Sequence, residues 1–208
     1  MDIAFIKTAF VTLFVAVDPP GLAAIFLGLT AAMSADARAR TARRSVIIAF
    51  AILLASAIGG KPLLTMLGIG IPAFRIAGGL LLFYIASEMV FERREERKSH
   101  SAEEAVAHDL HRHDIAAFPL AIPLMAGPGA ITATILQASA ADGHPMNFMG
   151  LIGILAIVTG SCYVVFRLSS TVDRFLGMTG RVVLSRLLGV LLAAMAVQII
   201  GDGVISFH

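Results

Sequence analysis

Charged residues are scarce in this sequence. They make up 14% of its 208 residues, whereas hydrophobic residues make up 58%, and a soluble domain carries about a quarter charged residues. Apolar runs of about 17–25 residues, long enough to cross a bilayer, recur along the chain. This composition excludes a soluble globular domain, and we predict an integral, multi-pass membrane protein. The six expected spans cover residues 3–33, 44–60, 71–91, 115–140, 148–168 and 182–206.

Cysteine and tryptophan are nearly absent. Cys162 is the only cysteine, so an internal disulfide is excluded. Tryptophan is missing altogether, which weakens the aromatic belt that often marks a membrane interface. The sequence also lacks a Walker loop, a G-x-S-x-G and an H-E-x-x-H signature. We therefore expect neither an enzyme nor a bound cofactor or metal.

Lysine and arginine are few in every second connection between the expected spans. The connections after spans 2 and 4 hold Lys61 alone, whereas those after spans 1, 3 and 5 are rich in cations. By the positive-inside rule the cation-rich connections are cytoplasmic and both termini lie outside, in the periplasm. We interpret these cations as topology signals and not as a nucleic-acid surface. They are Arg38, Arg40, Arg43, Arg44, Arg93, Arg94, Arg97, Lys98, Arg112, Arg167, Arg174 and Arg181.

Two of the apolar spans are interrupted near their centres. The first carries DPPG at residues 18–21, and the fourth carries AGPG at residues 126–129. The third and sixth spans each carry an R-x-x-G segment, beginning at Arg75 and Arg186. The chain therefore reads as two halves, each with a broken span, a plain span and an R-x-x-G span.

Three spans per half force the second half to enter the membrane from the opposite side. The predicted fold is an all-α integral membrane protein of six transmembrane helices, arranged as two inverted three-helix repeats. The first helix of each repeat is broken near the membrane midplane, a plan common among secondary transporters. The expected units are the first repeat at 1–91, a charged cytoplasmic linker at 92–114 and the second repeat at 115–208.

Three stretches carry a family resemblance: IPAFRIAGGLLL, FPLAIPLMAGPGAITA and RLLGVLLAAMAVQII. They resemble the MarC family of bacterial inner-membrane proteins, and the likeness covers essentially the whole chain. The resemblance implies six helices in the inner membrane of a bacterium and transport of small neutral amino acids such as glycine or alanine. At the first break the family often has Asn-Pro, where this chain has Asp18-Pro19.

The two breaks also predict a binding site. Proline suits the first turn of a helix, so Asp18-Pro19 and Gly127-Pro128 each read as the start of a half-helix. Asp18 would cap the first start, whereas the second leaves the N–H groups of residues 129–131 open to a carboxylate. Ionised Asp18 would accept an ammonium group, so a small zwitterionic amino acid satisfies both ends. The candidate substrate-binding residues are Asp18, Pro19, Pro20, Gly21, Gly127, Pro128, Gly129, Ala130, Ile131 and Thr132.

Three charged residues inside the expected spans leave alternatives open. Arg75 and Arg186 either hold the carbonyl ends of the half-helices, pair with Asp18 or Glu88, or extend to the nearest interface. Glu88 is either an interfacial charge or a proton carrier. The coupling ion is correspondingly either a proton at Asp18 or sodium at the unwound backbone. In the linker, His100, His108, His111 and His113 are read as part of a solvated segment and not as metal ligands.

The predicted function is secondary transport of a small neutral amino acid by alternating access, as an exporter or an exchanger. A membrane channel or a regulatory scaffold is the alternative, because broken helices also shape pores and grooves. A membrane-embedded enzyme using Asp18 is a third reading, although the central spans offer it no second catalytic carboxylate or histidine.

Overall fold

The computed structural model describes residues 2–94, 96–100 and 115–207, and over these residues the chain forms helices and no strand. Five helical stretches are long and apolar enough to cross a membrane, and a bent pair makes a sixth. The expectation of an all-helical membrane protein is thereby confirmed. The elements are α1 (Ile3–Val17), α2 (Pro19–Leu29), α3 (Ala35–Met66), α4 (Ile71–Val90), η1 (Ala116–Met125), α6 (Pro128–Ala140), α7 (Pro145–Arg167) and α8 (Ser169–Ile205).

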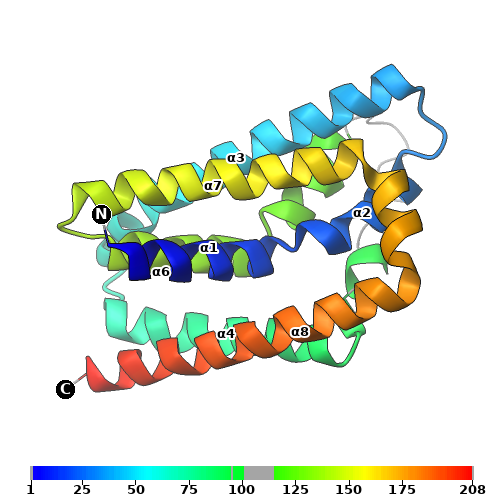
Figure 1. Cartoon of the computed structure of the whole chain (residues 1–208). Coiled ribbons are helices and arrows are strands. Elements are labelled where there is room, and N and C mark those ends of the chain that lie inside the picture. The colour runs from blue at the N-terminus through cyan, green and yellow to red at the C-terminus, as the bar shows by residue number, and fades with distance from the viewer. Residues whose placement is uncertain (1, 95, 101–114, 208) are drawn as a thin grey trace.

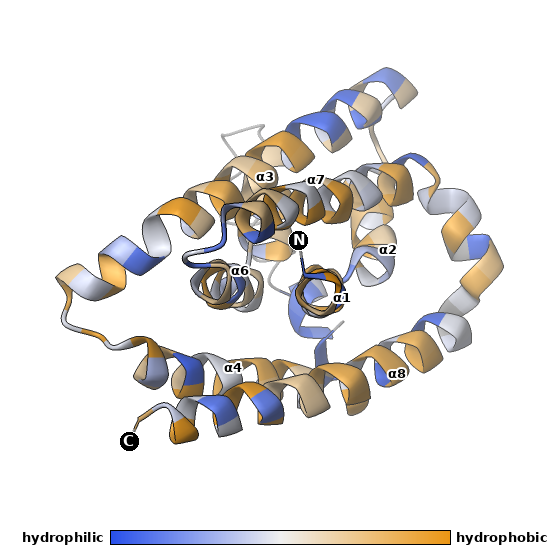
Figure 2. Cartoon of the chain, turned by 60° about the vertical axis from the view of Figure 1, so that its left-hand side comes forward, coloured by the Kyte–Doolittle hydropathy of each residue, from blue (hydrophilic) through white to orange (hydrophobic). Residues whose placement is uncertain are grey.

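The helices lie in layers. The antiparallel pair α4 and α8 forms one side of the bundle, and α3 with α7 forms the other (Figure 1). The pieces α1 and α6 lie between these two pairs, as the turned view also shows (Figure 2). Both termini lie at the same end of the bundle (Figure 1). The broken helices therefore lie between two pairs of unbroken ones.

The first break occurs at Asp18, as predicted. Asp18 adopts the left-handed conformation with a φ of 60°, and its side chain accepts a hydrogen bond from the Gly21 N–H at 3.2 Å. Two prolines then occupy the first turn of α2, where their missing N–H groups cost no helical hydrogen bond. Asp18 is thus confirmed as the N-cap of the half-helix. That half-helix ends at Leu29, four residues before the expected end at Met33.

The second break is wider than predicted. Within η1, Phe118 and Ile122 have extended backbone angles, and Pro119 and Pro123 lie inside the element. Because proline has no N–H, these two residues remove ordinary helical bonds, and wider bonds such as Ala126 N–H to the Ala121 carbonyl at 2.9 Å replace them. The pair η1 and α6 is bent by 60°. The interruption expected at 126–129 is therefore confirmed, and the two upstream prolines extend the irregular backbone from it back to Phe118.

Two helices extend beyond their expected spans. The Ser34 hydroxyl caps α3 by accepting from the Ala37 N–H at 3.3 Å, and the helix runs 32 residues from Ala35. The arginines between residues 38 and 44 therefore lie on its first turns and not in a loop, contrary to the expectation. The helix α8 is kinked at Gly177, whose φ is 57°, and its spanning part is Thr179–Ile205.

Gly189 of the second R-x-x-G segment and Gly79, which follows the first, lie at the contact between α4 and α8. A Cβ added at Gly189 would lie 2.8 Å from the Met89 Cβ and 3.0 Å from the Ala86 carbonyl oxygen. A Cβ at Gly79 would lie 3.0 Å from the Ala196 carbonyl oxygen. Because backbone atoms cannot move aside as a side chain can, the glycines permit this close approach.

We expect Gly189→Val to separate α4 from α8 and to lower the stability of the folded protein by about 1–3 kcal/mol, the usual cost of overpacking. A lower Tm in detergent would report it. The matched control is Gly201→Val on the same helix, where an added Cβ meets no described atom within 4 Å. Equal Tm values for the two variants would contradict this account of the contact.

Candidate functional site

A cavity of about 290 Å³ joins the end of α1 to the start of α6. We call it the break cavity. Its apolar wall comes from Ala16, Leu81, Ile85, Pro123 and Leu124. Its polar wall comes from the backbone of residues 127–130 and from three cations that follow α4, namely Arg94, Arg97 and Lys98. Residues 127–129 of the second break therefore form part of the wall of this cavity.

The N-terminus of α6 faces this cavity without a cap, because Gly127 has no side chain. The Ile131 N–H donates to the Gly127 carbonyl at 3.0 Å, so the expectation that Ile131 offers a free donor is wrong. The N–H groups of Gly129 and Ala130 lie in the first turn of α6, where helix geometry provides no acceptor for them. Thr132 instead packs against α4, where a Cβ at Gly78 would lie 2.7 Å from its Cγ2.

Asp18 lies behind the cation wall and is only 3% exposed. Besides capping α2, its carboxylate accepts a hydrogen bond from the Lys98 ammonium at 3.3 Å, and the Arg94 Nε lies 4.0 Å away. Pro19, Pro20 and Gly21 continue from it into α2 and do not contribute to the cavity wall that the described residues form. The carboxylate is therefore paired with cations of this chain.

Arg94 satisfies the open end of α1. It is 4% exposed and donates to the carbonyl oxygens of Val15 at 3.3 Å and Ala16 at 2.6 Å. This is the role that the sequence suggested for Arg75 or Arg186. Arg75 instead donates to the Ser206 hydroxyl at 3.3 Å, and Arg186 pairs with Glu92. The last two arginines lie nearer the helix ends, so pairing with Asp18 or Glu88 is excluded for them in this conformation.

Glu88 belongs to an ion pair at the rim of the break cavity. Its carboxylate lies 2.8 Å from the guanidinium of Arg97, which also lies over the Tyr84 ring. Around the cavity, the described residues therefore place three cations (Arg94, Arg97 and Lys98) against two carboxylates (Asp18 and Glu88). The uncapped start of α6 adds partial positive charge. The cavity consequently suits an anionic group.

Lys98 is held in an unfavourable environment for a charge. Burial lowers its pKa to about 8, the neighbouring Arg94 charge lowers it as well, and Asp18 opposes both. Below pH 8 the ammonium is therefore present and pairs with Asp18, and above pH 8 the amine loses its proton and the ion pair with it. Removal of the Asp18 charge would lower this pKa further.

A second cavity, of about 250 Å³, lies near the chain termini. We call it the terminal cavity. Thr8 of α1, Arg75 of α4, Gln137 of α6 and Asp202 of α8 contribute its polar groups. The first residues of α6 line the break cavity and its last residues line the terminal cavity. Both cavities therefore lie along one interface, between α1 and α6 on one side and α4 and α8 on the other.

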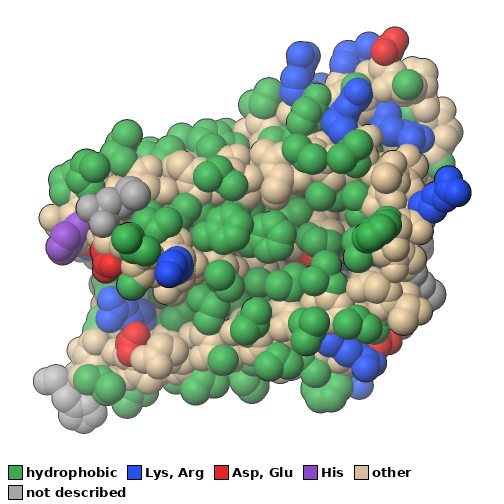
Figure 3. All heavy atoms as spheres, in the orientation of Figure 1, with side chains coloured by type: hydrophobic (Ala, Val, Ile, Leu, Met, Phe, Trp, Pro, Cys, Tyr) green, Lys and Arg blue, Asp and Glu red, His purple; other side chains and the backbone are tan. Residues whose placement is uncertain are grey.

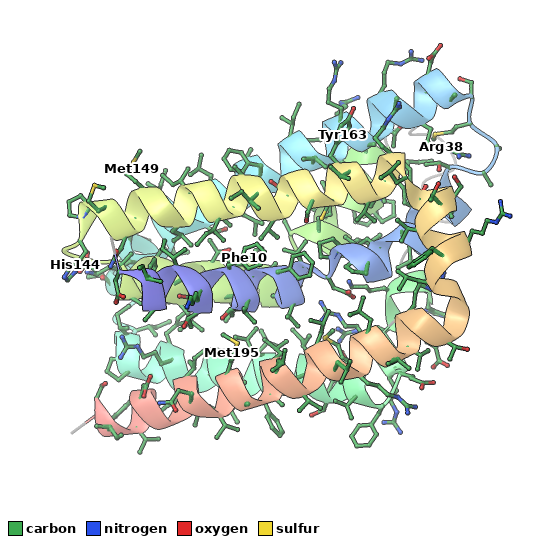
Figure 4. The ribbon with its side chains drawn as sticks, viewed as in Figure 1. Phe10, Arg38, His144, Met149, Tyr163 and Met195 are labelled. Carbon is green, nitrogen blue, oxygen red and sulfur yellow. The ribbon has the colours of Figure 1, made fainter. Side chains whose placement is uncertain are left out.

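Polar contacts separate the two cavities. The Gln137 amide donates to the Thr12 hydroxyl at 3.4 Å, and this hydroxyl lies 3.9 Å from the sulfur of Met195. Met195 projects from α8 into the space beside α1 (Figure 4). On the face between them, α4 and α6 also touch at Gly78. In the described conformation these contacts lie between the residues that line the two cavities.

Comparison with known proteins identifies the family. The family model described as MarC family integral membrane protein matches residues 3–207. The chain belongs to the MarC family. It is 37% identical to a UPF0056 membrane protein of Archaeoglobus fulgidus over 98% of this chain and 95% of the relative. It is 34% identical to the UPF0056 membrane protein YhcE of Escherichia coli, covering 94% and 89% of the two chains.

A further MarC-family relative, YvbG of Bacillus subtilis, is 34% identical over 98% of this chain and 95% of its own. No solved structure matches. The relatives thus come from archaea as well as bacteria, which is broader than the bacterial resemblance drawn from the sequence. Their names state a membrane protein and no substrate. The membrane class of this MarC protein is therefore established.

Sequence reasoning missed Arg94 and Lys98 as site residues, because a cation cluster after a span is the usual topology signal. Their spacing of four residues was the available clue, since it places both on one face of a helix. Among the linker histidines, His100 is described and is exposed, whereas His108, His111 and His113 lie outside the described residues. Among the described residues, no cluster suited to a metal ion is present.

We expect Arg94→Met to destabilise the MarC protein by about 3 kcal/mol, because it strands two carbonyls of α1 and weakens the pairing of buried Asp18. Thermal unfolding in detergent measures this. Arg93→Met is the matched control, since the neighbouring arginine is exposed. If Arg93→Met lowered the Tm as much as Arg94→Met, the buried contacts would not be the cause.

Proposed function

We propose that this MarC protein is a secondary transporter of small neutral amino acids, of the size of glycine or alanine, which works by alternating access. One observation carries the proposal: two cavities lie at opposite ends of α6 along one interface, separated by the contacts of Thr12, Gln137 and Met195. A carrier needs such a pair, because it opens to one side of the membrane at a time.

The break cavity supports the substrate class. A carboxylate fits the N–H groups of Gly129 and Ala130, where the helix dipole and the nearby cations favour negative charge. The apolar wall of Leu81, Ile85 and Leu124 suits a hydrogen or a methyl group and not a charged side chain. Asp18 supplies the acceptor for the ammonium group once its own cations move. A proton or sodium ion provides the coupling.

The contacts between helices support the inverted repeat. The order of broken, plain and plain helices occurs twice, as α1–α2, α3, α4 and as η1–α6, α7, α8. The contacts exchange accordingly: α3 packs on η1 and α6 as α7 packs on α1 and α2, and α4 packs on α6 as α8 packs on α2. We therefore propose 1–91 and 115–208 as the two repeats, joined by the linker at 92–114.

The distribution of cations supports the orientation. Most lysine and arginine side chains on the visible face gather at the end where α3 and α8 begin (Figure 3). We call it the arginine-rich end. Arg38 at this end also donates to the Thr30 carbonyl at 3.1 Å, which closes α2 (Figure 4). By the positive-inside rule this end is cytoplasmic and both termini are periplasmic, in the inner membrane of a bacterium.

Single cysteines in a Cys162→Ala background test the orientation. Arg40 is exposed at the arginine-rich end, and Asp142 is exposed at the other. We expect an impermeant thiol reagent added to intact cells to label Asp142→Cys and to leave Arg40→Cys unlabelled until the membrane is opened. The reverse pattern would place the termini in the cytoplasm.

Uptake by proteoliposomes tests the function, with a panel of labelled amino acids and imposed proton or sodium gradients. We expect Asp18→Ala to abolish transport and Asp18→Asn, which keeps a capping oxygen, to retain part of it. Gly129→Val should reduce the rate by about a hundredfold, because its added side chain meets Ile85 in the cavity wall and displaces the start of α6. Arg40→Ala, altered at an exposed arginine, is the control and should transport normally.

Each variant is checked for folding by its Tm before transport is compared. Transport by folded Asp18→Ala at the normal rate and affinity would reduce Asp18 to a helix cap and refute the proposed site. Counterflow of an amino acid against its own gradient separates the carrier from a channel or a scaffold, since neither of these exchanges substrate stoichiometrically.

A further inference from the structure

We propose that the segment following α4, described at residues 91–94 and 96–100, is a gate of the break cavity. In this gate the Lys98 ammonium binds Asp18 at the place that the amino group of a substrate takes. This inference rests on the proposed function. It assigns Lys98 as an intramolecular competitor of the substrate and places the gate at the arginine-rich end.

The chain reverses immediately after α4. Glu92 has a φ of 63°, and a helical turn begins at Arg93. The reversal directs Arg94 and Lys98, four residues apart on one face, back toward the first break. Their side chains are 5% and 10% exposed, respectively. The segment therefore enters the bundle at the mouth of the break cavity.

Three cations attach the segment to three different elements. Arg94 binds the last carbonyls of α1, Lys98 binds Asp18 at the start of α2, and Arg97 pairs with Glu88 of α4. All three also line the break cavity. A substrate can reach Asp18 from this cavity only if the cation wall gives way.

Lys98 is the cation best suited to leave. Arg94 donates to two backbone carbonyls as well as facing Asp18, so its departure would strand them. Lys98 is a flexible primary amine whose ammonium lies 3.3 Å from one carboxylate oxygen. Its exit to water restores the hydration of a buried charge. A substrate ammonium brings the same charge to the same oxygen, so the exchange leaves Asp18 paired throughout.

The gate predicts a specific kinetic signature. Lys98→Met keeps an unbranched apolar side chain but removes the competitor, so the KM for glycine and alanine should fall by about tenfold if the wild-type site is open in about one molecule in ten. Lys98→Arg retains a cation and should keep a KM close to that of the wild type. Arg93→Met, at an exposed neighbour, is the control.

A carboxylate without an amino group separates the gate from a general loosening of the protein. Propionate does not compete with Lys98 for Asp18, and Lys98→Met removes one cation of the cavity wall, so the inhibition constant of propionate should not fall with the KM. A KM that is unchanged or higher in Lys98→Met, in a protein whose wild type transports amino acids, overturns the gate and leaves the proposed function standing. Absence of amino acid transport by the wild type overturns the proposed function itself.

The wild-type chain supplies a second measurement, independent of how well a variant folds. Reductive methylation with isotope-labelled formaldehyde gives each lysine a methyl signal in the NMR spectrum, and Lys98→Arg identifies the one from Lys98. Alanine should move this signal toward the position of solvated lysines, and propionate should not. A signal that does not move with saturating alanine contradicts displacement of Lys98.

Discussion

Two helices broken inside the membrane leave backbone groups that lipid cannot satisfy, and the site follows from how this chain satisfies them. The end of α1 exposes carbonyls, and Arg94 binds them. The start of α2 exposes N–H groups, and Asp18 accepts from one. The cap position of α6 is Gly127, which has no side chain to accept from the N–H groups of that helix. Side chains therefore satisfy the backbone groups at the first break, whereas no side chain caps the N–H groups at the second, and an anion fits there.

Burial of Arg94 has consequences for the rest of the segment. Arg94 reaches the end of α1 because the chain reverses at Glu92, and the helical turn that follows also carries Arg97 and Lys98 into the cavity wall. Asp18 then serves two purposes, because it caps α2 and balances buried cations. Asp18 is therefore one member of a network of buried charges.

The sequence predicted the parts of this fold that depend on local chemistry. Adjacent proline and glycine residues within an apolar run favour a helix break, so the break at Asp18, the start of α6 at Pro128 and the cap role of Asp18 were predictable from the residues alone. The irregular stretch of η1 is equally local, because it follows from Pro119 and Pro123.

The partners of Asp18 depended on tertiary structure and could not be read in the same way. Arg94 and Lys98 lie in a cation-rich stretch of the kind that usually forms a cytoplasmic loop. The reversal at Glu92 directs them inward. For the same reason the sequence favoured Arg75 and Arg186, which lie inside their spans, as the arginines that bind the helix break. In the structure their described partners are Ser206 and Glu92.

The central claim is that the open start of α6 binds the carboxylate of a small amino acid. Protection of a single cysteine tests it most directly: Pro128→Cys in a Cys162→Ala background, reacted with a small thiol reagent, places the probe at an exposed position of the cavity wall. Glycine and alanine should slow the reaction in a saturable manner, whereas methylamine and ethylamine, which lack the carboxylate, should not. Equal protection by the amines, or none by the amino acids in a folded protein, would contradict the account.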